Sequence, residues 1–179
     1  MRKLIVSSFV SLDGVTEAPW TWTGSYFDDE SREYSLNKLA DVEFFLLGRR
    51  TYETFSATWP NVKDNEYMDR VNGLKKLVAS KTLENVTWNA SLLAGDAAGQ
   101  LANIKKEPGG NIMKYGISEL DRTLLANKLV DEYHLWIIPK YVGKGKRAFD
   151  DVDPSLVHLD LIDTQRLRNG SVILKYAPR

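Results

Sequence analysis

Short apolar runs alternate with helix-like segments over the first 130 residues, and strand-like runs then follow one another without helices between them. The predicted strands of the first part are 3–10, 42–47, 74–79, 86–88 and 111–115. The predicted helices start at Asp28 and at Arg50, then cover a polar stretch near 64–73, residues 96–106 and residues 116–129. Alternation of this kind is typical of a parallel sheet with helices on its faces.

The C-terminal part of the chain carries a different pattern. Residues 131–139, 155–167 and 171–177 predict strands, and Asn169-Gly170 between the last two is a strong signal for a hairpin. Strands joined by a tight turn pair in antiparallel fashion. The sequence therefore predicts one α/β domain, with a largely parallel sheet flanked by helices and finished by antiparallel strands.

Composition limits the class of protein. A chain of 179 residues with 43% hydrophobic and 11% aromatic content can bury one sizeable core, so residues 1–179 are expected to form a single domain. Lysine plus arginine equals aspartate plus glutamate at 24 each, which argues against a general nucleic-acid binder. No apolar run approaches the roughly 20 residues of a membrane span. The absence of cysteine removes disulfide and thiolate chemistry, and we expect a cytoplasmic protein.

The stretch EFFLLGRRTYETF at 43–55 ends a hydrophobic strand on a glycine and two arginines. Gly48 allows the backbone to approach a ligand, the helix that follows offers free N–H groups, and Arg49 and Arg50 add charged donors. The combination suits a phosphate group. The alternative is a solvated helix start, although cations at this position oppose the helix dipole.

Two further strand ends carry donors or a glycine. Ser80-Lys81-Thr82 follows the strand at 74–79, and Gly116 follows the strand at 111–115 directly before a helix. In open α/β sheets, ligands bind where strands end and helices begin. Three such strand ends suit one extended anion such as a dinucleotide. The chain has no Gly-x-Gly-x-x-Gly after its first strand, and VGKGKRAF lacks the Ser/Thr and the spacing of a P-loop, so neither common fingerprint applies.

Four motifs, taken in order, resemble the dihydrofolate reductase superfamily. They resemble most the C-terminal reductase domain of the bifunctional riboflavin-biosynthesis deaminase–reductase and its stand-alone relatives. The motifs are SLDG (11–14), LLGRRTYE (46–53), VASKTL (78–83) and LVDEYHLWIIPKYVGKGKRAF (129–149). The resemblance runs from about residue 2 to the C-terminus. It implies an NADPH-dependent reductase with a central sheet of about eight strands, the last ones antiparallel.

The resemblance implies roles for individual residues. The family's phosphate motif Gly-Arg-x-Thr corresponds to Gly48-Arg49-Arg50-Thr51, with Arg49 on the adenosine 2′-phosphate and Arg50 and Thr51 on the pyrophosphate. Ser80 and Lys81, with Thr82 beside them, correspond to the second wall of the 2′-phosphate site. Gly116 corresponds to the first glycine of a pair that touches the cofactor, and Ile117 replaces the second. Gly143, Gly145 and Lys146 correspond to a family loop that we expect to be structural.

Hydride transfer to a C=N or C=O group needs a proton source near the accepting carbon. Asp13 matches an acid of the riboflavin reductases that lies near the substrate, and its alternative role is that of an Asp-Gly turn residue. Glu33 stands on the first helix, roughly where dihydrofolate reductases carry a buried carboxylate, and its alternative is a solvated helix face. Asp13 and Glu33 are therefore the candidate catalytic residues.

Aromatic side chains in the loop at 11–27 are candidates for a substrate pocket. Trp20, Trp22 and Tyr26 could line a pocket for a flat heterocycle, or they could pin the loop to the core. His134 and His158 have no second ligand at metal spacing, so no metal site is predicted.

The strand at 131–139 also predicts a partner. Tyr133, Leu135 and Ile137 point to one face and Trp136 and Ile138 to the other, so both faces need cover. Together with the resemblance to dimeric relatives, this predicts a homodimer that uses the C-terminal antiparallel strands.

The substrate is predicted only as a small heterocyclic or carbonyl compound. A pyrimidine such as 5-amino-6-(5-phosphoribosylamino)uracil and a dihydrofolate-like pterin are both compatible with the resemblance. Two alternatives stay open, namely a reductase of an unrelated small carbonyl or pterin, and a module that binds NADP(H) without catalysis.

Overall fold

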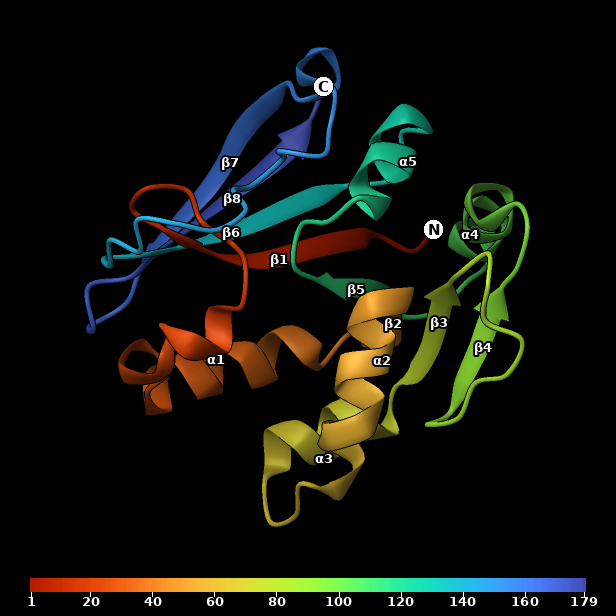
Figure 1. The fold of residues 1–179 in the computed structure, drawn as a ribbon, viewed down its shortest axis with the longest axis horizontal. Helices are drawn as coiled ribbons and strands as arrows, with labels where there is room; N and C mark the ends of the chain where they lie inside the picture. Colours follow the sequence, from red (N-terminus) through yellow and green to blue (C-terminus); the bar gives the residue numbers. More distant parts are fainter.

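The computed structural model describes residues 1–179 and contains an eight-stranded sheet with the strand order β4-β3-β2-β5-β1-β6-β8-β7 (Figure 1). The strands are β1 (Leu4–Ser11), β2 (Val42–Gly48), β3 (Lys75–Ala79), β4 (Ala90–Leu93), β5 (Asn111–Tyr115), β6 (Glu132–Ile138), β7 (Leu159–Arg166) and β8 (Val172–Pro178). The α-helices are α1 (Asp29–Leu39), α2 (Arg49–Thr58), α3 (Glu66–Gly73), α4 (Ala97–Lys106) and α5 (Leu120–Ala126).

The pairing of the strands confirms the predicted class of fold. The strands from β4 to β6 in this order pair in parallel, whereas β8 pairs antiparallel with both β6 and β7. The turn between β7 and β8 is the predicted hairpin, closed by a hydrogen bond of 2.9 Å from Leu167 N to Ser171 O. Gly170 in this turn has φ +88°, a conformation that glycine adopts without a steric penalty.

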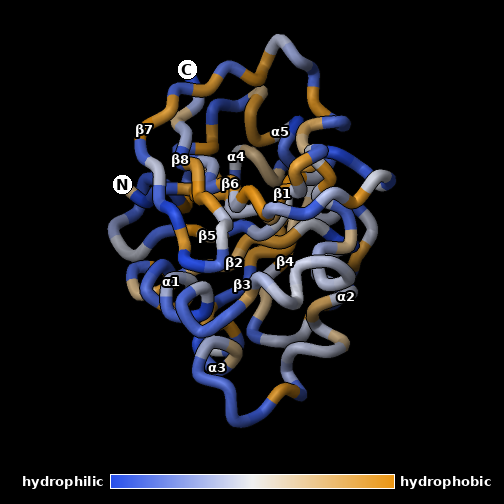
Figure 2. The backbone as a smooth tube through the Cα atoms, turned by 90° about the vertical axis from the view of Figure 1, so that its left-hand side faces the viewer, coloured by the Kyte–Doolittle hydropathy of each residue, from blue (hydrophilic) through white to orange (hydrophobic).

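The helices form one layer on each face of the sheet, with α1, α2 and α3 on one side and α4 and α5 on the other (Figure 1). Neighbouring residues of β2 therefore face different cores: Phe45 and Leu47 pack with α1–α3, whereas Leu46 packs with α4 and α5. A parallel strand buried on both faces reads as a continuous apolar run, which is how this strand appears in the sequence. Figure 2 shows hydrophobic residues along the strands and a largely hydrophilic α1.

Two predicted segments were placed wrongly. Residues 86–88 are not a strand, because the strand is β4 at Ala90–Leu93, and Trp88 and Asn89 have φ angles of +60° and +53°. Trp88 is held by packing and by a hydrogen bond of 2.8 Å from its Nε1 to Asn72 Oδ1. The helix predicted over 116–129 is also shorter, since α5 covers only Leu120–Ala126.

The reason given for a homodimer does not hold for β6. Tyr133 packs into the core beneath α4 and α5, and Trp136 and Ile138 pack against aromatic residues of the 11–27 loop and of α1. Both faces of β6 are thus covered by the chain itself. Among the three C-terminal strands, the exposed large hydrophobic residues lie on β7, where Leu161 and Ile162 are 54% and 51% exposed.

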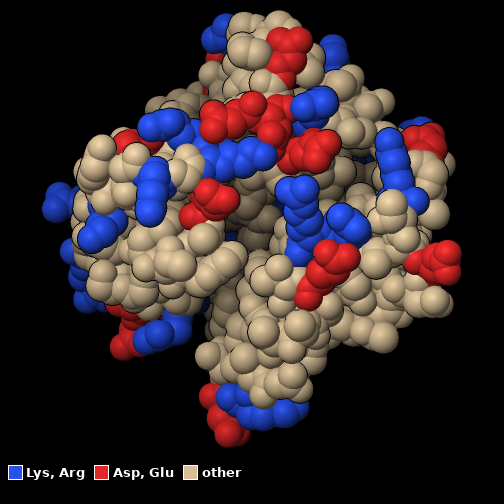
Figure 3. All heavy atoms as spheres, viewed as in Figure 1, with Lys and Arg blue, Asp and Glu red and all other residues tan.

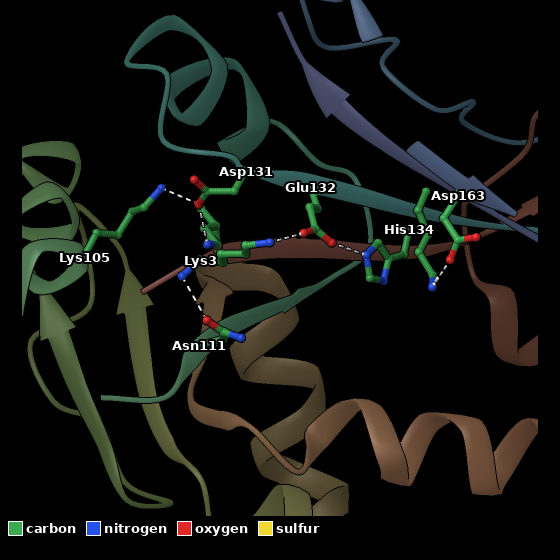
Figure 4. Close-up of polar contacts among 9 residues, drawn as sticks. Lys3, Lys105, Asn111, Asp131, Glu132, His134 and Asp163 are labelled. Carbon is green, nitrogen blue, oxygen red and sulfur yellow. Dashed lines mark hydrogen bonds and ion pairs between the residues drawn. The ribbon is translucent and has the colours of Figure 1, made fainter. Parts of the chain in front are cut away.

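Side-chain contacts tie together the N-terminal ends of the central strands (Figure 4). Lys3 Nζ lies 2.7 Å from Glu132 Oε1, and Glu132 Oε2 lies 2.8 Å from Nε2 of the buried His134. Lys105 Nζ lies 2.5 Å from Asp131 Oδ2. These contacts join β1, β6 and α4 at the edge of the sheet opposite to the carboxyl ends of the parallel strands.

Burial lowers the pKa of His134 to about 4, against the opposing effect of Glu132. The imidazole is therefore neutral at pH 7, and its contact with Glu132 is a hydrogen bond rather than an ion pair. An unfolded histidine titrates near 6.5, so the unfolded state binds the extra proton first as the pH falls. The stability contributed by neutral His134 is complete above pH 6.5 and is lost as the pH falls towards 4.

We predict that urea unfolding will report a loss on the order of 3 kcal/mol from this group between pH 7 and pH 4. His134→Gln keeps a donor for Glu132 but does not titrate, so its stability should fall less over this range. The exposed His158 is the matched control, and His158→Gln should follow the wild type. Identical pH profiles for all three proteins would contradict the prediction.

Candidate active site

The carboxyl ends of the parallel strands meet at one edge of the sheet. Gly48 at the end of β2 pairs with Ala79 at the end of β3, and Ser7 of β1 pairs with Tyr115 at the end of β5. β1 continues beyond this point and pairs only with β6, up to Ser11. Figure 3 shows a hollow near the middle of the molecule, with Lys and Arg side chains beside it above α2. The predicted cofactor residues thus share one edge with the end of β1.

Gly48 is partly exposed and borders open space at the start of α2. Its φ of −78° and ψ of 162° suit any residue, and a Cβ atom at this position would meet nothing within 4 Å. Neither backbone conformation nor packing within the chain requires a glycine here. No side chain caps α2, so N–H groups of its first turn keep free hydrogen-bonding capacity. This strand end therefore has both the space and the donors that a phosphate needs.

The two arginines and the threonine of the first turn of α2 are weakly engaged. Arg49 is half-exposed, and its only ion pair, with Glu53, is long at 4.0 Å. Arg50 is exposed, and neither its guanidinium nor the Thr51 hydroxyl makes a hydrogen bond within the chain. Exposed pairs of this length contribute little to stability. Both guanidinium groups are accordingly free to contact an anion.

The turn after β3 lies beside the start of α2, because Ala79 pairs with Gly48. The buried Ser80 shapes this turn, and its Oγ accepts hydrogen bonds from Thr82 N at 3.2 Å and Leu83 N at 3.0 Å. Lys81 and Thr82 are exposed. The structure thus brings Ser80-Lys81-Thr82 and Gly48-Arg49-Arg50-Thr51 to neighbouring strand ends.

Gly116 and Ile117 lie at the next strand end. Gly116 has φ +75°, and a Cβ atom there would meet nothing within 4 Å. Its N–H donates to Ser7 O at 2.8 Å, which links the turn to β1. The N–H of Ile117 has no hydrogen-bond partner within the chain.

The carboxylate of Asp13 holds two loops together. It accepts hydrogen bonds from Val142 N at 3.0 Å, Gly143 N at 2.8 Å and Ser11 Oγ at 2.8 Å. These bonds, with the contact to Val142 as the largest cause, lower the pKa of Asp13 to about 2. Asp13 is therefore ionised at neutral pH and is a poor proton donor. The geometry favours a role in positioning the 139–148 loop at the rim of the site.

Glu33 is exposed on α1 and makes no hydrogen bond or ion pair. A carboxylate in this setting is solvated, in contrast to the buried carboxylate of the resemblance. Glu33 makes no hydrogen bond or ion pair with any of the other predicted site residues.

The three predicted aromatic residues differ in their surroundings. Trp22 Nε1 donates to Glu17 O at 2.9 Å and the Tyr26 hydroxyl donates to Pro139 O at 3.2 Å, and both rings pack on the cluster around Trp136. Trp20 is 67% exposed and takes no part in that cluster. Trp22 and Tyr26 thus pin the loop to the core, and Trp20 is the most exposed of the three rings.

The sequence patterns did not predict two exposed hydrophobic residues near Asp13 as site residues. Leu12 and Tyr141 are 64% and 73% exposed, and Leu12 N donates to Lys140 O at 3.0 Å. They are therefore neighbours at the end of β1 and β6, although 129 positions separate them in the sequence (141 minus 12). Only the pairing of β1 with β6 brings them together, so no local pattern could have predicted this.

Buried polar groups behind the same edge were also missed. The hydroxyl of Tyr67 donates to that of Tyr115 at 2.8 Å, and burial raises the pKa of Tyr67 to about 12, so its hydroxyl stays protonated. Lys114 is 2% exposed and forms an ion pair with the fully buried Asp121. The sequence did contain one sign of this buried pair, because Lys114 interrupts the otherwise apolar strand NIMKY.

No group of three or more metal-ligating side chains is present, and no helix is long and apolar enough to cross a membrane.

The strand order and the site at the carboxyl ends of the strands define a dihydrofolate reductase-like α/β protein. A dihydrofolate reductase from Enterococcus faecalis, solved as a complex with NADP(H) and RAB-propyl, has a TM-score of 0.65 at 15% identity, over 99% of this chain and 96% of its own. A pyrimidine reductase-like protein from Corynebacterium diphtheriae has a TM-score of 0.66 at 13% identity, over 99% of this chain and 92% of its own. At these identities the likeness is one of fold.

The chain belongs to the RibD C-terminal domain family, whose model matches residues 2–173. This is a family of reductases that use NAD(P)H. The uncharacterized protein YyaP of Bacillus subtilis (strain 168) is 27% identical over 179 residues, which cover 98% of this chain and 94% of YyaP. The resemblance inferred from the four sequence motifs is therefore confirmed.

We predict that Asp13→Asn will loosen the 139–148 loop. An amide oxygen can replace only part of a carboxylate that accepts three hydrogen bonds, and the amide NH₂ opposes the N–H groups of Val142 and Gly143. Hydrogen exchange at Val142 and Gly143 should therefore be faster than in the wild type. Glu33→Gln, the same chemical change at a solvated site, is the control and should leave exchange unchanged. Equal protection of both amides in Asp13→Asn and wild type would refute the loop role.

Proposed function

We propose that this protein is an NADPH-dependent reductase that transfers a hydride to a small heterocyclic or carbonyl substrate. The observation that carries the proposal is the start of α2. It combines a glycine that packing does not require, an uncapped helix and two weakly engaged arginines. Ser80-Lys81-Thr82 at the neighbouring strand end adds a second set of donors.

These residues fit an anionic dinucleotide. Gly48, Arg49, Arg50 and Thr51 would hold its phosphates, and Lys81 with Ser80 and Thr82 would add the second wall around the 2′-phosphate. Charged hydrogen bonds of this kind are stronger than neutral ones. When bound, the dinucleotide supplies the hydride, and the chain's own residues orient it and exclude water.

We propose a pyrimidine of the riboflavin type, 5-amino-6-(5-phosphoribosylamino)uracil, as the first substrate to test. Leu12 and Tyr141 offer apolar surface beside the end of β1, and Trp20 adds an exposed ring on the loop that follows β1. Aromatic rings of this kind suit a flat heterocycle. Asp13 would border this substrate as the residue that fixes the loop of Tyr141, and water would supply the proton.

A second candidate function is that of a module that binds NADP(H) without catalysis. The state of the two candidate catalytic acids favours it. The carboxylate of Asp13 is bound to the 139–148 loop, and Glu33 is exposed to solvent, so neither is set up to donate a proton to a substrate. Oxidation of NADPH, followed at its nicotinamide absorbance with a panel of pyrimidines, pterins and carbonyls, separates the two functions. Turnover on any of them supports the reductase, whereas tight NADPH binding without turnover on all of them supports the module.

We predict that the protein binds NADPH more tightly than NADH and that Arg49→Ala removes most of this preference. One charged hydrogen bond is worth roughly 1.5–3 kcal/mol, so its loss should weaken NADPH binding about tenfold or more. NADH lacks the 2′-phosphate and should lose little. Calorimetric titration of both cofactors measures the effect.

Arg179→Ala is the matched control for this experiment. Arg179 is also an exposed arginine in an ion pair, with Asp160, but it lies at the end of β8, beside the start of β6. Its replacement should leave both affinities unchanged. Equal affinities of the wild type for NADPH and NADH would overturn the proposed cofactor site.

We also propose that a second copy of this chain covers β7. This strand is at the end of the sheet, pairs only with β8 and exposes Leu161 and Ile162. Leu161→Asp should convert a dimer into a monomer without loss of fold, as measured by light scattering and circular dichroism. A wild type that is monomeric at micromolar concentration would exclude the dimer.

A further inference from the structure

A closed network of buried polar groups lies behind the turn after β5. Lys114 Nζ lies 2.6 Å from Asp121 Oδ2, and the exposed fractions of the two side chains are 2% and 0%. Asp121 also accepts hydrogen bonds from Ser118 N at 2.8 Å and from the Tyr133 hydroxyl at 3.0 Å. Burial, followed by the charge of Asp121, raises the pKa of Tyr133, so this hydroxyl remains a donor. The network joins β5, β6 and the first turn of α5.

Stability alone is a weak explanation for this network. Removing two charges from water costs about as much as their attraction returns, and apolar side chains of similar volume often stabilise a core at least as well. The neighbours of Lys114 on this side of the sheet, Ile112 and Leu124, are apolar and fully packed. A charged pair in such a place calls for a role beyond packing.

A second contact of Lys114 indicates what that role is. Its ammonium also donates to the carbonyl oxygen of Gly116, the first residue after β5. Glycine tolerates more than one orientation of the peptide that follows it, because it has no Cβ atom. The residue itself therefore does not fix the plane of the Gly116–Ile117 peptide, whereas the contact with Lys114 does.

The direction of the Ile117 N–H follows from that contact. In a trans peptide the C=O and N–H bonds point in opposite directions, and the chain contains no cis peptide bond. The Gly116 carbonyl points to Lys114, on the side of α5, so the Ile117 N–H points away from α5. It has no partner within the chain, and the next strand in the sheet is β2, which ends at Gly48 and α2.

We propose that Lys114 and Asp121 are positioning residues, which hold the Gly116–Ile117 peptide so that the Ile117 N–H donates a hydrogen bond to an acceptor oxygen of the bound dinucleotide. The inference rests on the proposed cofactor. It assigns the contact with the dinucleotide at this strand end to the main-chain N–H of Ile117. The side chain at 117 is then free to pack on the core beneath α5, as it does. Isoleucine is accordingly compatible with this position.

Three variants distinguish an effect on the orientation of the Gly116–Ile117 peptide from an effect on the stability of the fold. Lys114→Met/Asp121→Asn removes both charges, and the amide keeps an acceptor for the Ser118 N–H and a partner for the Tyr133 hydroxyl, so this double variant should fold with a urea midpoint close to that of the wild type. Lys105→Met is the control, since Lys105 is the other buried lysine that is paired with an aspartate, at the opposite edge of the sheet. Replacement of Ile117 by its α-hydroxy acid puts an ester oxygen in place of the N–H and keeps every side chain of the network, while the Gly116 carbonyl becomes a weaker acceptor for Lys114.

The first readout needs no cofactor. In the wild type, the Ile117 amide resonance should shift when inorganic pyrophosphate is added, and in the double variant its starting position should differ and its response should be lost. The second readout is the affinity for NADPH, which should fall about tenfold in both the double variant and the ester variant. Lys105→Met should change neither readout.

The outcomes distinguish this inference from the proposed function. A wild type that fails to bind NADPH overturns the proposed function, and the response of the Ile117 amide to pyrophosphate then decides the inference alone. An ester variant that binds NADPH or pyrophosphate as tightly as the wild type overturns the inference while the proposed function stands. Equal losses in Lys105→Met and the double variant would also overturn it, because they would indicate a general effect on the fold.

Discussion

The parallel pairing of β1 with β5 on one side and β6 on the other is the constraint on which the rest of the structure depends. Parallel strands cannot be joined by tight turns, so helices must cross over each face of the sheet and bury both. The same pairing sends the carboxyl ends of the parallel strands to one edge. Residues that are far apart in the sequence, among them Asp13, Arg49 and Gly116, are brought to that edge as a consequence.

The two edges of the parallel sheet are used differently. At the amino ends, Lys3, Glu132 and His134 bind one another, and Lys105 binds Asp131, so charged groups there are occupied within the chain. At the carboxyl ends, Gly48 and Gly116 leave open space and Arg49 is held only by a long contact. Charged groups at the amino ends are thus paired within the chain, whereas the strand ends at Gly48 and Gly116 keep unsatisfied donors, which is the division expected of a scaffold with a binding site.

Charged side chains near the site act mainly on the backbone. Asp13 accepts hydrogen bonds from Val142 N and Gly143 N, and Lys114 donates to the Gly116 carbonyl. Each fixes a loop whose glycine would otherwise allow several conformations. A binding site formed largely by main-chain groups needs such supports, because its donors have no side-chain rotamer to hold them in place.

The sequence by itself determined the order of strands and helices, the change to antiparallel pairing after residue 130 and the glycine and arginines after β2. These features are local, since apolar periodicity and turn residues act between near neighbours. Only the tertiary structure decided that Trp88 belongs to a loop, that the chain covers both faces of β6 and that Asp13 is bound to Val142 and Gly143. It alone also paired Lys114 with Asp121 and placed Leu12 beside Tyr141. Such contacts join residues through the sheet and the packing of helices on it, and no pattern along the chain encodes the distance between them.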